Sequence, residues 1–112
     1  MRAVGVKAFG GPEALELMDV AVPEPGPGQA LVKLAFAGVN YIDVYMRKGV
    51  YPRPPGSTAA TSIIGMEGAG EVVKVGSDTG DIKVGARVAY CMVPNSYAEY
   101  AVVPAWRLAP VP

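Results

Sequence analysis

The sequence contains no histidine, which removes the commonest general base, the commonest metal ligand and every histidine-dependent catalytic triad. Its one cysteine, Cys91, allows no disulfide within the chain and no zinc site built from several cysteines. The ten Lys and Arg residues equal the ten Asp and Glu residues and are scattered, unlike the basic surface of a nucleic-acid-binding protein. No apolar run is long enough to cross a bilayer. We therefore expect neither a nucleic acid nor a membrane as partner.

The start of the chain and its length set further limits. The stretch MRAVGVKAFGGPE lacks the long apolar segment and the small-residue cleavage site of a secretory signal, so we expect a cytoplasmic protein. A chain of 112 residues fits one small domain, residues 1–112, and with 51% hydrophobic residues it can bury a core.

Short strand-like segments separated by glycine and proline dominate the chain. In ALVKLAFAGV, Val32, Leu34 and Phe36 fall on one apolar face of the expected strand. Such segments recur about every 8–12 residues, which predicts a mainly β fold, a closed or nearly closed barrel. The segments are RAVGVKAF, ALELMDVAV, ALVKLAFAGV, EVVKVG, ARVAYCMV and YAEYAVV.

The segment NYIDVYMRKG breaks the strand pattern and predicts one short helix. Asn40 is a good N-cap, Gly49 can end the helix, and Asp43 and Arg47 can pair across one helical turn. Residues 51–62 follow and are expected to form a loop, because their closely spaced prolines are incompatible with a regular strand.

The glycine-rich stretch IIGMEGAG, residues 63–70, first suggests a phosphate site. A dinucleotide fingerprint has the order G-x-G-x-x-G and opens a helix whose N-terminus faces the pyrophosphate. Here the order is G-x-x-G-x-G, and the EVVKVG that follows is strand-like. We therefore expect the glycines to have a structural role.

The same stretch resembles the G-H-E-x-x-G-x-x-x-x-x-G segment of the zinc alcohol dehydrogenases in the medium-chain dehydrogenase/reductase superfamily. The zinc-binding histidine of that family falls at Met66, and its cysteine ligand falls at Asn40. Because a thioether is a poor ligand for zinc, we expect no metal here. The other family positions are present as Gly65, Glu67, Gly70 and Gly76.

Longer stretches resemble the N-terminal domain of the zinc-independent NADPH:quinone oxidoreductases, and the resemblance covers essentially the whole chain. It implies a GroES-like, partly open β-barrel with one or two short helices. The Rossmann domain that binds NADPH in this family is absent from the 112 residues, so we expect an excised fragment rather than a natural truncation, and a parent that can be a homodimer. The matching stretches are FGGPEALEL, VPEPGPGQALVKLAFAGVNYIDVYMRKGVYP, GMEGAGEVVKVGS, IKVGARVAY, SYAEYAVVP and RLAPVP.

The resemblance implies hydride transfer from NADPH to a quinone or another conjugated carbonyl. Such acceptors take hydride readily and need mostly positioning and modest polarisation, whereas alcohol oxidation gains from a zinc-stabilised alkoxide. The absence of both zinc ligands therefore favours a conjugated acceptor over an alcohol as substrate. Two alternatives stay open: an enoyl reductase of the same superfamily, and a stand-alone GroES-like binding or assembly module without redox activity.

By resemblance, Asn40 and Tyr45 line the cleft where the nicotinamide meets the substrate, and both are expected to be catalytic and to contact the cofactor. Arg47 is expected to be a further cofactor contact. Asn40 has a second reading as the helix cap, and it can serve in both ways. Tyr45 has a second reading as core packing.

Five other residues have structural expectations. Glu67 is expected to hydrogen-bond the turn around it, and Met66 to pack as a soft apolar group where the zinc ligand would be. Tyr51 belongs to a surface loop or borders an acceptor pocket. Cys91 is expected to be buried and inert. Trp106 is expected to pack at the domain edge, where a second domain would attach.

Overall fold

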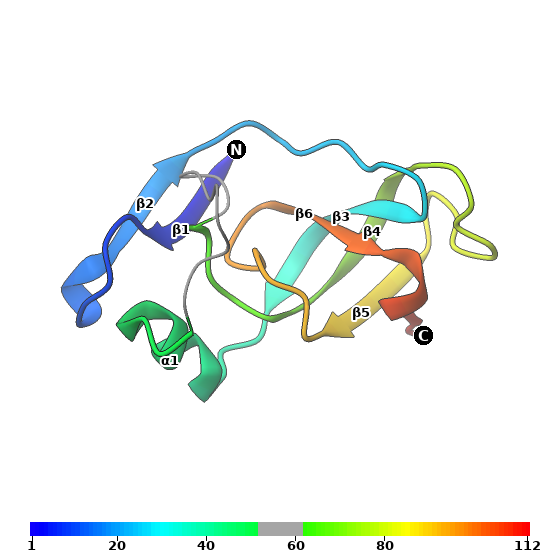
Figure 1. The fold of residues 1–112 in the computed structure, drawn as a ribbon. Helices are drawn as coiled ribbons and strands as arrows, with labels where there is room; N and C mark the ends of the chain where they lie inside the picture. The colour runs from blue at the N-terminus through cyan, green and yellow to red at the C-terminus, as the bar shows by residue number, and fades with distance from the viewer. Residues whose placement is uncertain (52–61) are drawn as a thin grey trace.

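The computed structural model describes residues 1–51 and 62–112 and folds them into antiparallel sheets with one α-helix beside them (Figure 1). The helix α1 spans Tyr41–Lys48, and the short 3-10 helices η1 and η3 span Pro12–Ala14 and Ala105–Arg107. The strands are β1 (Arg2–Val6), β2 (Leu15–Asp19), β3 (Gln29–Ala37), β4 (Glu67–Val75), β5 (Arg87–Cys91), β6 (Tyr100–Pro104) and β7 (Ala109–Pro110).

The strands form two sheets. β1 and β2 make a two-stranded ribbon, and the other five strands follow the order β6-β3-β4-β5-β7. Two isolated bridges, Ala3 with Ala98 and Gly5 with Ile63, join β1 to the rest of the molecule. In the described part of the chain, β6 and β7 are the two edges of the larger sheet, so the barrel is not closed. The prediction of a mainly β, partly open fold is confirmed.

The core lies against the five-stranded sheet and consists largely of valine, whose branched side chain suits a pleated surface. Val32, Val72, Val88 and Val103 come from four different strands and are fully buried. Ala30, Tyr90, Val93, Ala101 and Leu108 complete the cluster.

One strand prediction is wrong in its second half. Phe36 does not share a buried face with Val32, since its side chain is 75% exposed while Val32 is fully buried. The pairing of β3 with β4 is irregular between Leu34 and Phe36: Leu34 pairs with Gly70, Phe36 pairs with Ala69, and Ala35 is skipped. A bulge of this kind bends the strand and interrupts the alternation of its side chains.

The helix begins and ends where the sequence predicted. Asn40 is the N-cap in extended conformation, and Gly49 ends the helix with a left-handed φ of 85°, a conformation that glycine adopts without steric cost. None of the helices in the described residues has the length and apolar character that a membrane crossing requires. Of the predicted proline loop, residues 52–61 lie outside the described residues.

The glycines of residues 65–70 are structural, as predicted. Gly65 has a φ of +99°, and a Cβ there would lie 2.5 Å from the ring of Tyr97. Gly70 lies within β4, where a Cβ would come within 2.0 Å of the carbonyl oxygen of Lys33 on β3. No helix follows them, since the segment leads directly into β4.

Candidate functional site

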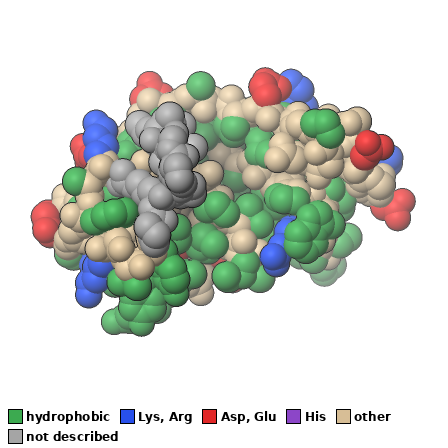
Figure 2. All heavy atoms as spheres, in the orientation of Figure 1, with side chains coloured by type: hydrophobic (Ala, Val, Ile, Leu, Met, Phe, Trp, Pro, Cys, Tyr) green, Lys and Arg blue, Asp and Glu red, His purple; other side chains and the backbone are tan. Residues whose placement is uncertain are grey.

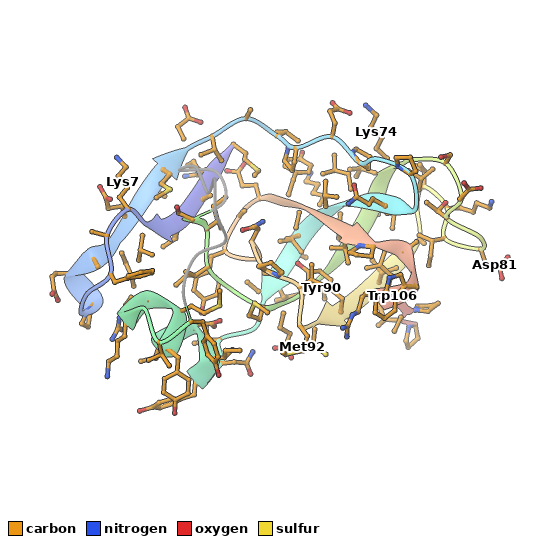
Figure 3. The ribbon with its side chains drawn as sticks, in the orientation of Figure 1. Lys7, Lys74, Asp81, Tyr90, Met92 and Trp106 are labelled. Carbon is orange, nitrogen blue, oxygen red and sulfur yellow. The ribbon has the colours of Figure 1, made fainter. Side chains whose placement is uncertain are left out.

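A pocket of about 230 Å³ opens where α1 begins, beside the start of β4 and the end of β5. Met92, on its rim, follows the last residue of β5 and has a left-handed φ of 62°; Figure 3 shows it at the outer end of that strand. The lining residues are Asn40, Ile42, Met66, Glu67, Cys91 and Met92. Three of them, Asn40, Met66 and Glu67, were singled out from the sequence as family positions or candidate site residues.

Asn40 caps the helix with its backbone and faces the pocket with its side chain. Its backbone N–H donates to Oδ2 of Asp43 at 3.0 Å, which closes one half of a capping box. Its side-chain Nδ2 donates to Oε2 of Glu67 at 3.4 Å. The helix entry therefore fixes the backbone of Asn40 and turns its amide toward the pocket.

Glu67 lies against the end of β3 as well as against Asn40. Its backbone oxygen accepts a hydrogen bond from Gly38 N–H at 2.9 Å. A Cβ on Gly38 would lie 1.5 Å from Oε2 of Glu67, so the carboxylate occupies the space that a larger residue would need. Glu67 was expected to bond the turn around it, but its backbone bonds Gly38 and its carboxylate bonds Asn40, both in the segment after β3.

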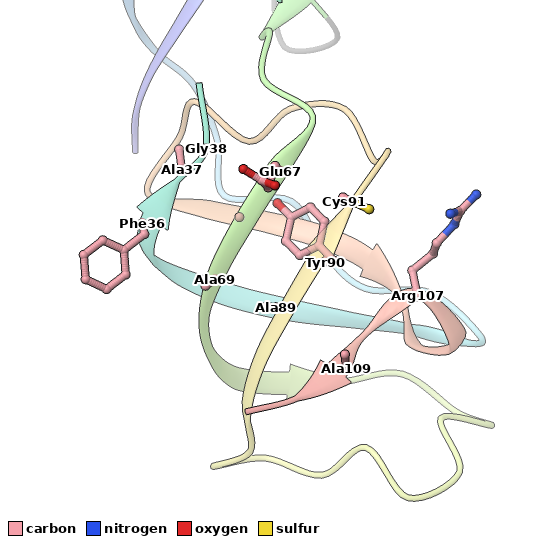
Figure 4. A pocket seen from close by; sticks show the side chains of 11 residues that line it. Phe36, Ala37, Gly38, Glu67, Ala69, Ala89, Tyr90, Cys91, Arg107 and Ala109 are labelled. Atoms are coloured by element: carbon pink, nitrogen blue, oxygen red, sulfur yellow. The ribbon is translucent and has the colours of Figure 1, made fainter. Parts of the chain in front are cut away.

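A larger groove of about 490 Å³ adjoins the pocket and shares Glu67 and Cys91 with it. The groove runs across β3, β4, β5 and β7, and Figure 4 shows Phe36 on one side of it, Arg107 on the opposite side and Glu67 between them. Most of its lining is small or apolar: Phe36, Ala37, Gly38, Gly68, Ala69, Ala89, Tyr90 and Ala109. An apolar trough with a few polar groups suits a flat organic molecule.

Tyr45 is on the outer side of α1 and is not a core residue. Its side chain is 40% exposed, and its ring meets Tyr41 edge-on at 5.4 Å and Tyr51 edge-on at 6.5 Å between centroids. Figure 2 shows hydrophobic side chains gathered over this helix. Tyr45 is not among the residues that line the Asn40 pocket, so the described structure does not bring the two predicted catalytic residues into one cavity.

The predicted ion pair between Asp43 and Arg47 is wrong. Asp43 is 4% exposed and points into the molecule, where its Oδ2 accepts from Asn40 N–H and from the Tyr97 hydroxyl at 2.5 Å. Arg47 instead donates from Nε to the carbonyl oxygen of Gly10 at 3.2 Å. The two side chains leave the helix in different directions because each finds a partner in a distant segment.

Three further expectations have mixed outcomes. Met66 is half-buried in the pocket wall, which agrees with soft packing at the family's ligand position. The prediction that Cys91 is buried is wrong, because Cys91 ends β5 at the sheet margin and is exposed. Trp106 is 77% exposed and does not pack against the domain. Its ring lies under the guanidinium of Arg107, 4.5 Å from Cζ to the centroid.

Sequence analysis missed Tyr97. Burial, and after it the hydrogen bond and charge of Asp43, raise the pKa of the Tyr97 hydroxyl well above its ordinary value of 10.0, so this group stays a donor. The two bonded residues are 54 positions apart, and no local pattern links them. In contrast, Asp43 stands three positions after Asn40, and this local spacing is a capping pattern that can be recognised in the sequence.

The two family ligand positions at the pocket do not supply zinc ligands, although Glu67 and Cys91 also line it. Structural and catalytic zinc sites use histidine, cysteine and carboxylate ligands, whereas the two family ligand positions hold an amide, Asn40, and a thioether, Met66. Throughout residues 1–51 and 62–112, no three His, Cys, Asp or Glu residues lie together in a way that could hold a metal ion.

An open antiparallel sheet, one capped helix at the end of β3 and a polar pocket at their junction define a GroES-like domain of the dehydrogenase type. Residues 26–112 match the alcohol dehydrogenase GroES-like domain, and the chain belongs to this family. It is similar to the quinone oxidoreductase of Pseudomonas aeruginosa, with 44% identity over 106 residues that cover 94% of this chain and 31% of that protein. It is also similar to the human quinone oxidoreductase, with 41% identity over 104 residues that cover 91% of this chain and 31% of that protein.

Solved structures agree with this assignment. The Escherichia coli quinone oxidoreductase complexed with NADPH superimposes with a TM-score of 0.89 at 33% identity, over all of this chain and 33% of that one. A mycobacterial protein complexed with NADPH gives a TM-score of 0.87 at 41% identity, over all of this chain and 32% of that one. The chain thus spans about a third of the length of the relatives it matches.

Proposed function

We propose that this chain is the catalytic, acceptor-binding domain of an NADPH-dependent, zinc-independent quinone oxidoreductase. The substrate is a quinone or another conjugated carbonyl. The single observation that carries the proposal is the amide of Asn40 in the pocket, at the position where the zinc enzymes have a cysteine ligand. Similarity to quinone oxidoreductases over most of the chain supports the same conclusion.

The pocket chemistry suits an acceptor that is already activated. When bound, NADPH would supply the hydride, and with one proton from solvent this would convert a quinone to its hydroquinone. The chain then needs to hold the acceptor flat and to stabilise negative charge as it develops on oxygen. A positioned amide N–H does this without a metal, and Asn40 carries such an amide beside Glu67.

Tyr45 and Arg47 are proposed to contact the acceptor or the cofactor. The exposed ring of Tyr45, in contact with Tyr41 and Tyr51, offers an aromatic face to a flat acceptor or to the nicotinamide. Arg47 has its Nε bound to Gly10, so its terminal nitrogens would make the proposed contact with the cofactor. A cytoplasmic location and a homodimeric parent stay predictions.

A second candidate is reduction of a conjugated carbon–carbon double bond. The chain is also similar to the 2-haloacrylate reductase of Burkholderia sp., with 36% identity over 104 residues that cover 92% of this chain and 31% of that protein. Both reactions deliver hydride to a conjugated acceptor, and they differ in the atom that receives it.

The test is steady-state turnover of the full-length enzyme with NADPH and three acceptors: naphthoquinone, a haloacrylate and an enoyl thioester. We expect naphthoquinone to be preferred, and Asn40→Ala to lower its kcat about 10- to 100-fold, the range for losing one charge-stabilising donor. Turnover of the haloacrylate or the thioester alone would reject quinone reduction. No turnover with any acceptor would favour a binding module.

A further inference from the structure

Asp43 is buried in an arrangement that is poor for stability alone. Its Oδ2 accepts two hydrogen bonds, from Asn40 N–H and from the Tyr97 hydroxyl. Its Oδ1 is also buried and has no hydrogen-bond partner among the described residues. An unsatisfied buried acceptor costs free energy, and native proteins keep few of them. A carboxylate kept under this penalty calls for a role beyond holding the fold together.

Tyr97 is fixed by its backbone before its hydroxyl reaches Asp43. Its N–H donates to the carbonyl oxygen of Ile64 at 2.9 Å, and its own carbonyl accepts from Val4 N–H on β1 at 2.8 Å. Its ring fills the space left by Gly65, where any Cβ would lie within 2.8 Å of the Tyr97 amide nitrogen. Tyr97 is therefore a rigid anchor on the sheet side of the molecule.

The anchor joins the two walls of the pocket. One wall is the entry to α1, which carries Asn40, and Asp43 is on the first turn of that helix. The other wall is the segment before β4, which carries Met66. This segment is held to the connection that contains Tyr97 by hydrogen bonds from Val93 N–H to Met66 O at 3.3 Å and from Ser96 N–H to Gly65 O at 3.1 Å.

We propose that Asp43 and Tyr97 are positioning residues, whose hydrogen bond sets the place of Asn40 relative to Glu67 and thereby the rate of reduction. Neither side chain lines the Asn40 pocket, so both act through Asn40. The inference rests on the proposed function, because it assigns Asn40 a role in turnover. A displacement of Asn40 by a fraction of an ångström weakens a preorganised contact that the reaction needs.

The decisive variant is Tyr97→Phe, which removes one oxygen and leaves the ring against Gly65. In the full-length enzyme we expect kcat with naphthoquinone to fall about tenfold, while KM for NADPH stays within about twofold. Tyr100→Phe is the matched control: Tyr100 is on β6, paired with Lys33, and it touches neither Asp43 nor the pocket.

Two readouts separate positioning from folding. The side-chain amide resonance of Asn40 is expected to shift in Tyr97→Phe and to stay in place in Tyr100→Phe, while the melting temperature is measured for both. Equal kcat for Tyr97→Phe and Tyr100→Phe would overturn the inference, as would a loss confined to KM for NADPH. If the unmodified enzyme reduces no quinone, the proposed function fails instead, and the amide resonance alone decides whether Asn40 moves.

Discussion

At the scale of single residues, two glycines leave room for groups that lie against them. Gly38 leaves room for the carboxylate of Glu67, and Gly70 leaves room for the backbone of Lys33. The two contacts differ in kind, since a carboxylate at the end of a flexible side chain can move and a strand backbone cannot. The same substitution at the two positions should therefore have different consequences.

Gly70→Ala is expected to lower the free energy of unfolding by about 3 kcal/mol, because its Cβ would force β3 and β4 apart. Gly38→Ala is expected to cost less than about 1 kcal/mol, because only Glu67 has to rotate. Urea unfolding of the chain measures both values. Equal losses for the two variants would show that Glu67 is not free to leave its place beside Asn40.

The errors of sequence reasoning also belong to single residues. Phe36 and Cys91 have apolar or neutral side chains in strands, and alternation alone makes them core candidates. Each lies at the end of its strand, Phe36 after a bulge and Cys91 before a turn. Where a bulge falls depends on the partner strand, and nothing within β3 itself encodes it.

At the scale of elements, α1 is attached at both ends to connections that lie between strands. Its first turn is held through Asp43 to Tyr97, and its last turn through Arg47 to Gly10. The helix itself was predictable, because Asn40 and Gly49 are strong local start and stop signals. Its attachments were not, because both partners are distant in the chain and depend on how the strands are arranged.

The attachment at Tyr97 predicts an alkaline effect on stability. Because the folded state raises the pKa of this hydroxyl above 10.0, its stabilising contribution is complete below pH 10 and is lost as the pH rises toward the folded-state value. Tyr97→Phe should be less stable by about 1 kcal/mol at neutral pH. Above pH 10 it should lose stability less steeply than the unmodified chain.

Chemical unfolding at a series of pH values through this range tests the prediction, with Tyr100→Phe as the control. Tyr90, whose pKa is also raised by burial, contributes the same alkaline slope to every variant and cancels in the comparison. Identical slopes for the unmodified chain and Tyr97→Phe would contradict the assigned hydrogen bond.

At the scale of the whole molecule, the strand rhythm and the glycine and proline turns predicted a mainly β fold, and the family resemblance added its open, GroES-like form. The sequence also supplied Asn40, Met66 and Glu67, because they fall within a recognisable motif. The sequence did not predict that Cys91 lines the pocket or that Tyr97 holds Asp43 in place. Both come from strands β5 and β6 and their connection, which only the folded sheet brings to the start of α1.

The central claim is that this domain handles its acceptor with neutral polar groups and without zinc. The most direct test is naphthoquinone turnover by the full-length enzyme before and after exhaustive chelation, with the zinc content measured on the same samples. We predict an unchanged rate and no stoichiometric zinc. One zinc per chain beside Asn40 and Met66, with turnover lost on its removal and restored by zinc alone, would contradict the claim.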